Sequence, residues 1–91
     1  MALYAIIRSE RAINNDALAT NIAKKYAFYR LGKGQWIVSA DDSAKGVCQS
    51  LGITPGQHYG GTLVLLVEDY FGLHDKKLWE WLKKFQPPLG E

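Results

Sequence analysis

Four runs of β-forming residues separate the polar segments of the chain and predict four strands. They cover residues 3–7, 27–31, 36–39 and 62–68. The first run shows no polar alternation, which is typical of a strand covered on both faces. The second and third runs are separated by only four residues, the turn Gly32, Lys33 and Gly34 followed by Gln35. These two runs therefore predict a β-hairpin.

Three amphipathic segments between and after these runs predict helices. The first covers residues 16–25, with Asn14, Asn15 and Asp16 as N-cap candidates. The second lies between cap candidates at 41–43 and Gly52. The third lies between Asp75 and Pro87. Their apolar faces contain Leu18, Ile22 and Tyr26 in the first, Ala44, Val47, Cys48 and Leu51 in the second, and Leu78, Trp81, Leu82 and Phe85 in the third. This spacing of three and four residues predicts one buried face for each helix.

The order of these elements predicts the α+β class. Strand, helix, strand, strand, helix and strand describe the ferredoxin-like βαββαβ fold, here with a four-stranded antiparallel sheet and an extra C-terminal helix. Strands one and three are expected in the centre of the sheet and strands two and four at its edges. We assign residues 1–85 to a single domain and residues 86–91 to a C-terminal tail.

Composition and charge narrow the function classes. The chain has 91 residues and a net charge of +2, which is too small to imply a surface that coats a polyanion. Its single cysteine, Cys48, forms no internal disulfide or structural zinc site and is interpreted as a core residue. A domain this small often needs reinforcement, so we expect a homodimer that uses the apolar edge strand at 63–67 or the C-terminal helix beside it. We expect a soluble cytoplasmic protein with no membrane partner and no cofactor.

The end of the first strand is the candidate site. We expect strands one and three to run parallel, so that their C-terminal ends meet at one edge of the sheet. Arg8, Ser9, Glu10 and Arg11 then lie beside residues 41–43, and His58 and Tyr59 join them. Two helix N-termini with two arginines favour an anion or nucleic-acid site.

The candidate binding residues at that end are therefore Arg8, Ser9, Arg11 and His58. The alternatives are a surface ion pair between an arginine and Asp41 or Asp42, and an ordinary loop position for His58. No catalytic residue and no metal ligand is predicted, and Asp75 near His74 is interpreted as a helix cap.

Aromatic residues on the predicted hairpin suggest a second binding mode. Phe28, Tyr29 and Trp36, with Arg30 and Lys33, would stack on single-stranded bases if they shared an open face. The alternative is that they alternate between two covered faces and fill a small core, with the terminal helix or a partner over the open face. We favour this second interpretation.

The whole layout also resembles a known family. Leu-Tyr-Ala-Ile-Ile at 3–7, Gln-Trp-Ile-Val-Ser at 35–39, Leu-Val-Leu-Leu-Val at 63–67 and Leu-Trp-Glu-Trp-Leu at 78–82 are similar to segments of small ferredoxin-like proteins related to the CRISPR-associated adaptation endonuclease subunit. The resemblance implies a symmetric dimer. It also implies a metal-binding Asp at the end of the first strand, where this chain has Arg8 and Ser9.

Because arginine does not ligate a divalent cation, the nuclease activity is not expected to carry over. The resulting hypothesis is a non-enzymatic homodimeric binding or scaffolding module, with nucleic acid as a candidate partner. One alternative is a metal-dependent endonuclease using Glu10, Asp41 or Asp42. Another is a regulatory or toxin-antitoxin-like domain that binds a protein.

Overall fold

The computed structural model describes residues 2–54, 59–70, 72 and 74–85 and contains one four-stranded sheet. The strands are β1 (Ala2–Ile7), β2 (Ala27–Gly32), β3 (Gln35–Ala40) and β4 (Leu63–Val67). Their spatial order is β2-β3-β1-β4, and every neighbouring pair is antiparallel. The predicted ferredoxin-like order is confirmed, with β2 and β4 at the edges.

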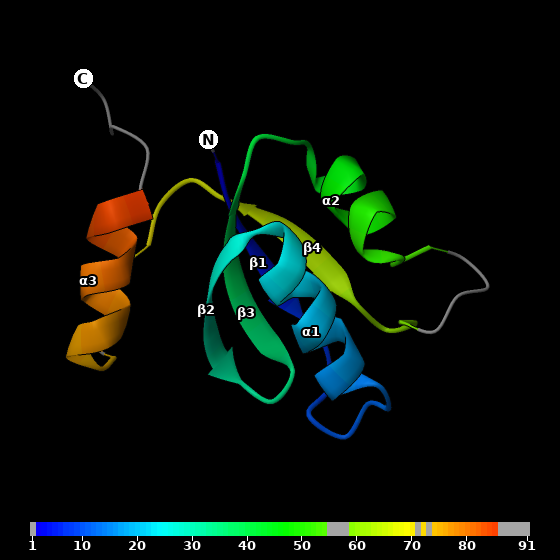
Figure 1. The fold of residues 1–91 in the computed structure, drawn as a ribbon. Coiled ribbons are helices and arrows are strands. Elements are labelled where there is room, and N and C mark those ends of the chain that lie inside the picture. The colour runs from blue at the N-terminus through cyan, green and yellow to red at the C-terminus, as the bar shows by residue number, and fades with distance from the viewer. Residues whose placement is uncertain (1, 55–58, 71, 73, 86–91) are drawn as a thin grey trace.

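Helices cover both faces of this sheet (Figure 1). The helices are α1 (Asn15–Lys25), α2 (Ala44–Leu51) and α3 (Lys76–Phe85). Helices α1 and α2 pack on one face, and α3 packs on the other. None of the helices within the described residues is both long and apolar enough to cross a membrane.

Polar caps fix the starts of α2 and α3 where the sequence predicted them. The Ser43 hydroxyl accepts a hydrogen bond from the Gly46 N–H at 3.0 Å, and the Asp75 carboxylate accepts one from the Leu78 N–H at 3.0 Å. Gly52 ends α2 with a φ of 81°, a conformation that favours glycine. Asn14 precedes α1 with a φ of 67°, but its side chain makes no capping hydrogen bond.

The main core lies between the sheet and the helices α1 and α2. Trp36 on β3 is fully buried and is the largest side chain in it. The core consists of Tyr4, Ile6, Leu18, Ile22, Trp36, Val38, Ala40, Val47 and Leu51. Cys48 is half-buried on the same helix as Val47, and burial raises the pKa of its thiol.

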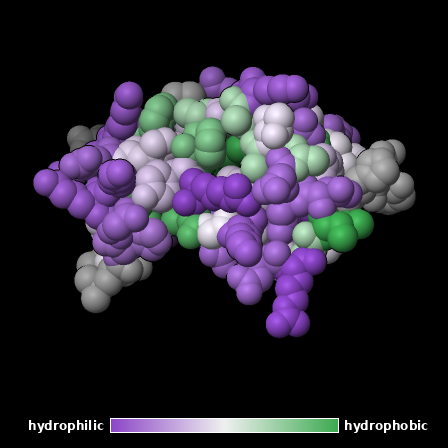
Figure 2. Space-filling view, turned by 60° about the horizontal axis from the view of Figure 1, so that its bottom comes forward, coloured by the Kyte–Doolittle hydropathy of each residue, from purple (hydrophilic) through white to green (hydrophobic). Residues whose placement is uncertain are grey.

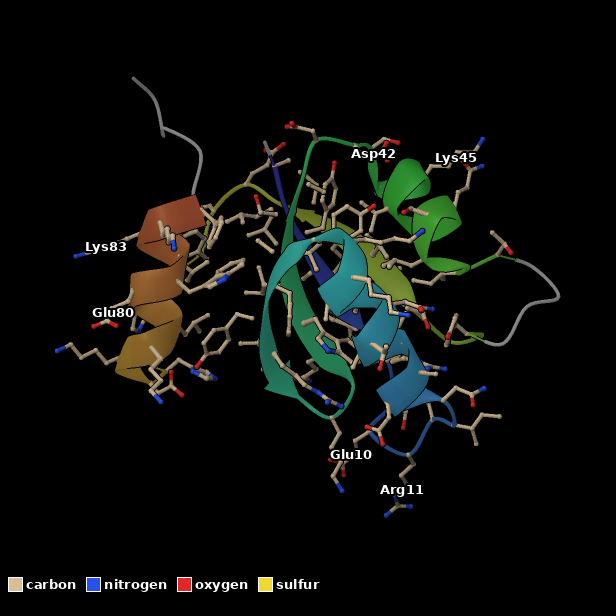
Figure 3. All side chains as sticks on the ribbon, in the orientation of Figure 1. Glu10, Arg11, Asp42, Lys45, Glu80 and Lys83 are labelled. Atoms are coloured by element: carbon tan, nitrogen blue, oxygen red, sulfur yellow. The ribbon has the colours of Figure 1, made fainter. Side chains whose placement is uncertain are left out.

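A second, smaller core lies under α3 on the opposite sheet face. Its buried members are Leu3 on β1 and Leu78 and Leu82 on α3. Aromatic rings surround them, with the Trp81 and Phe85 centroids 4.8 Å apart. The charged residues of α3 lie on its outer side, as Glu80 and Lys83 show in Figure 3.

The Tyr29 hydroxyl ties β2 to the start of α3 by donating a 2.8 Å hydrogen bond to the Asp75 carboxylate. The Leu78 N–H and this hydroxyl hold the pKa of Asp75 below its usual value, and the same bond raises the pKa of Tyr29. Asp75 thus caps α3 and attaches it to the sheet.

One expectation about the sheet is wrong. Strands β1 and β3 run antiparallel, with Ala2 opposite Ala40 and Ile7 opposite Gln35. The hairpin reverses β3 relative to β2, which the crossover through α1 makes parallel to β1. Residues 41–43 therefore lie at the opposite end of the sheet from Arg8, and Figure 3 shows Asp42 far from Glu10 and Arg11.

Candidate functional site

Arg8 is a buried residue at the end of β1, with only 5% of its surface exposed. Strand alternation places its side chain on the same sheet face as Tyr4 and Ile6, which is the face covered by α1 and α2. Its guanidinium donates through Nη1 to the Ile13 carbonyl at 3.1 Å and through Nη2 to the Gly60 carbonyl at 3.3 Å.

Tyr59 covers the same guanidinium. The Arg8 Cζ atom lies 5.6 Å from the centroid of the Tyr59 ring, within the range of a cation–π interaction. The Nε atom of Arg8 is buried and has no hydrogen-bond partner among the described residues. Arg8 therefore joins the loop after β1 to the segment before β4.

The tip of the β2–β3 hairpin packs directly on the backbone of Arg8. The Arg8 N–H donates to the Gly34 carbonyl at 2.8 Å. A Cβ atom on Gly34 would lie 2.3 Å from the Arg8 carbonyl oxygen, so a glycine is needed for this close approach. A polar cavity of about 280 Å³ lies beside this contact, lined by residues 8–10 and 32–35.

The loop from Ser9 to Asn14 is held by Asn15 at the first position of α1. The buried Asn15 side chain donates to the carbonyls of Ser9 and Glu10, each at 3.2 Å. The Ser9 hydroxyl accepts from the Arg11 N–H at 3.1 Å. Ser9 and Arg11 are exposed on this braced loop, whereas His58 lies outside the described residues.

The described residues at this end differ from the anion site that the sequence suggested. Tyr59 is present there as expected, but the guanidinium of Arg8 is enclosed by backbone carbonyls and an aromatic ring. Asp41 and Asp42 lie at the other end of the sheet, so neither the two-helix anion site nor the ion pair with Arg8 is formed. There, the Tyr4 hydroxyl donates to the Asp42 carbonyl.

Sequence reasoning missed the role of Asn15. Its position just before a helical pattern indicated an N-cap, whereas its side chain holds the preceding loop. The only signal available in the sequence was its place between a loop and a helix, which a cap shares.

The hairpin aromatics do not form one stacking surface. Trp36 is buried in the main core, and the guanidinium carbon of Arg30 lies 5.2 Å from its ring centroid. Phe28 and Tyr29 are neighbours on β2 and therefore point to opposite faces of the sheet. Tyr29 lies under α3, as the interpretation of two covered faces predicted.

Strand β4 presents the most apolar exposed edge of the described sheet. Leu63, Leu65 and Leu66 are 56%, 43% and 50% exposed. Within the described residues β4 pairs with β1 alone, so its outer backbone groups have no strand partner. Ile7 lies opposite Leu63 in the register and is 40% exposed, which extends the apolar surface onto β1.

The face at the hairpin tip is different in character. Figure 2 shows hydrophilic side chains over most of this face, with hydrophobic ones in small separate groups. Among the described residues, Ile13 in the braced loop is the most exposed large apolar side chain, at 76%. Single exposed apolar residues of this kind are common on protein surfaces, unlike a continuous apolar strand edge.

Comparisons with protein-family models, with curated proteins and with solved structures gave no match. Among the residues that the structure describes, no three His, Cys, Asp or Glu side chains are grouped so that they would hold a metal ion.

Proposed function

We propose that this protein is a non-enzymatic binding module that works as a homodimer joined through strand β4. The observation that carries this proposal is the set of exposed leucines on an edge strand, Leu63, Leu65 and Leu66. Edge strands that do not pair with another chain usually carry a charged residue, a proline or a bulge. Residues 63–67 contain no charged residue and no proline. This edge is therefore suited to pairing.

A second copy of the chain fits this edge by symmetry. Two β4 strands can be related by a twofold axis that passes between their Leu65 residues. They would then pair antiparallel and place Leu63 of each copy opposite Val67 of the other. Both four-stranded sheets would join into one, with the two α3 helices on the same face. The outer backbone groups of β4 would gain partners, and its leucines would contact the β4 side chains of the other copy.

The strength of the association follows from the length of the strand. Five residues from each copy make a small contact compared with a standard interface of about 1,600 Å². We expect a dissociation constant in the micromolar range. Contacts between residues that flank β4 would strengthen the association.

Sedimentation velocity over a concentration series tests this proposal. The wild type should shift from the 10.2 kDa monomer toward twice that mass as concentration rises. Leu65→Lys should remain monomeric because two lysines would face each other across the twofold axis. Phe28→Lys is the matched control, since it places the same charge on the opposite edge strand, and it should associate like the wild type.

Equal association of Leu65→Lys and the wild type would remove β4 as the interface. A wild type that stays monomeric at every concentration would remove the homodimer altogether.

Nucleic acid is the other partner class that the sequence suggested. The geometry around Arg8 gives it no specific support, because that guanidinium is buried and donates to backbone carbonyls. Arg11 is the exposed arginine of the loop, and Lys33 is exposed on the neighbouring hairpin. Two exposed cations beside Glu10 make a weaker argument than the apolar edge of β4.

A further inference from the structure

A cavity of about 200 Å³ lies between α3 and the sheet face that this helix covers. The sheet side is formed by one residue from each of three strands, and the helix side by three residues of α3. These six residues are Leu31, Ile37, Val67, Leu78, Trp79 and Leu82. The cavity thus lies between α3 and the strands beside the second core, and it is open to solvent near the exposed residues Gly72 and His74.

The segment between β4 and α3 completes the wall with Tyr70, Gly72 and His74. The rings of Tyr70 and Trp79 lie 6.0 Å apart with an angle of 34° between their planes. Burial raises the pKa of Tyr70, with a smaller effect from Asp69, as expected beside an apolar space. No Lys, Arg, Asp or Glu is among the described residues that line the cavity.

His74 supplies a polar side chain at this wall. Its Nδ1 atom accepts a hydrogen bond from the Asp75 N–H at 2.9 Å. With Nδ1 engaged by this N–H, Nε2 is the ring nitrogen left to bind a ligand.

We propose that this cavity binds a neutral compound with one aromatic ring and one hydrogen-bond acceptor oxygen. A dry apolar cavity of about 150 Å³ is large enough to bind benzene, so a ring with a short substituent fits 200 Å³. The aromatic wall favours a flat ring, and the described lining, which contains no Lys, Arg, Asp or Glu, disfavours an ion. The acceptor oxygen would accept a hydrogen bond from Nε2 of His74.

Such a ligand would contact the sheet and α3 at the same time. Binding would therefore stabilise the docked position of α3, in addition to filling the space beneath it. The cavity shares Val67 with β4 but includes none of the exposed leucines, and all its lining residues come from one chain. This proposal therefore does not depend on the homodimer.

Titration of the ¹⁵N-labelled protein with benzyl alcohol, followed by NMR, tests the proposal. Saturable shifts are expected at Val67, Tyr70 and the Trp79 indole N–H, with a dissociation constant in the millimolar range or below for a ligand of about eight non-hydrogen atoms. Benzoate, which has the same ring and a charge, should bind at least about tenfold more weakly. His74→Ala should weaken benzyl alcohol but leave toluene unchanged.

Two matched variants locate the site. Val67→Phe fills the cavity from β4 and should abolish the shifts. Val67→Leu is the smaller change for the case in which the Val67→Phe protein does not fold, and it should weaken the shifts. Ile7→Phe adds the same ring on the same sheet face at the end that α3 leaves uncovered, and it should bind like the wild type.

Three results would overturn the proposal. They are the absence of saturable shifts at the cavity residues, unchanged binding in a folded Val67→Phe protein, and equal binding of benzoate and benzyl alcohol. Each of these can occur whether or not the protein dimerises, so the outcome is separate from that of the β4 test.

Discussion

The guanidinium of Arg8 lies under the ring of Tyr59, with its carbon 5.6 Å from the ring centroid. The same side chain donates to the carbonyls of Ile13 and Gly60, which belong to segments far apart in the chain. A charged residue at the end of a strand is thus used inside the fold, where it connects two loops.

Arg8→Ala should lower the free energy of unfolding by about 2–4 kcal/mol, because it removes two charge-assisted hydrogen bonds and the packing on Tyr59. Chemical denaturation measures this loss. Arg11→Ala removes an exposed arginine from the same loop and should change the stability by less than about 0.5 kcal/mol. Similar losses in both variants would contradict the structural role of Arg8.

Gly34→Ala should destabilise the protein by about 1–3 kcal/mol, because its Cβ would lie 2.3 Å from the Arg8 carbonyl oxygen and 2.9 Å from that of Ser9. These are backbone atoms, so a side-chain rotation cannot relieve the contact. Gly60→Ala is the control, since a Cβ there meets nothing within 4 Å. Thermal unfolding followed by circular dichroism compares the two, and a Gly34→Ala protein as stable as Gly60→Ala would show that the hairpin tip does not pack on β1.

Much of this fold is predictable from the sequence because each element has a clear boundary. Apolar runs end at glycines or polar residues, and Ser43 and Asp75 cap helices where their spacing predicted. The predicted and observed strands and helices differ by no more than one or two residues at their ends.

The candidate site was harder to predict, for two physical reasons. Its partners depend on strand direction, and the hairpin reverses β3 so that Asp41 and Asp42 lie away from Arg8. Burial of Arg8 depends on tertiary contacts with Ile13 and Gly60, which no local pattern encodes. One signal for this burial was available in the sequence. Arg8 continues the alternation of Tyr4 and Ile6, which places its side chain on the face covered by α1 and α2.

The stability supplied by Asp75 should depend on pH. Its pKa in the folded protein is lowered, first by the Leu78 N–H and then by the Tyr29 hydroxyl. A lowered pKa means that the carboxylate stabilises the fold above its unfolded pKa, and that this contribution is lost as pH falls through the folded value. Asp75→Asn should therefore be less stable than the wild type at neutral pH, and the difference should shrink in acid.

Urea denaturation of both proteins at neutral pH and near pH 2 checks this prediction. A difference that stays constant or grows on acidification would mean that the charge of Asp75 does not contribute. The Asn variant keeps a side-chain oxygen for the Leu78 N–H, so the comparison isolates the charge.

Leu82→Ala should release α3 while leaving the rest of the fold intact, because Leu82 packs in the second core only. The loss of a buried leucine costs about 2–5 kcal/mol, which is large for one ten-residue helix. Hydrogen exchange should accelerate in α3 and remain slow in β1 and β3. Leu18→Ala, in the main core, should instead accelerate exchange throughout the protein, and the same pattern in both variants would contradict two separate cores.

The pairing of β4 with its own copy is tested most directly by NMR on a sample that mixes ¹³C,¹⁵N-labelled and unlabelled chains. Isotope-filtered NOE spectra report only contacts between different copies. The proposal predicts contacts between backbone protons of residues 63–67 in one copy and the same residues in the other, in an antiparallel pattern centred on Leu65. Intermolecular contacts that involve another surface, such as α3 or β2, or none at concentrations where a dimer sediments, would contradict it.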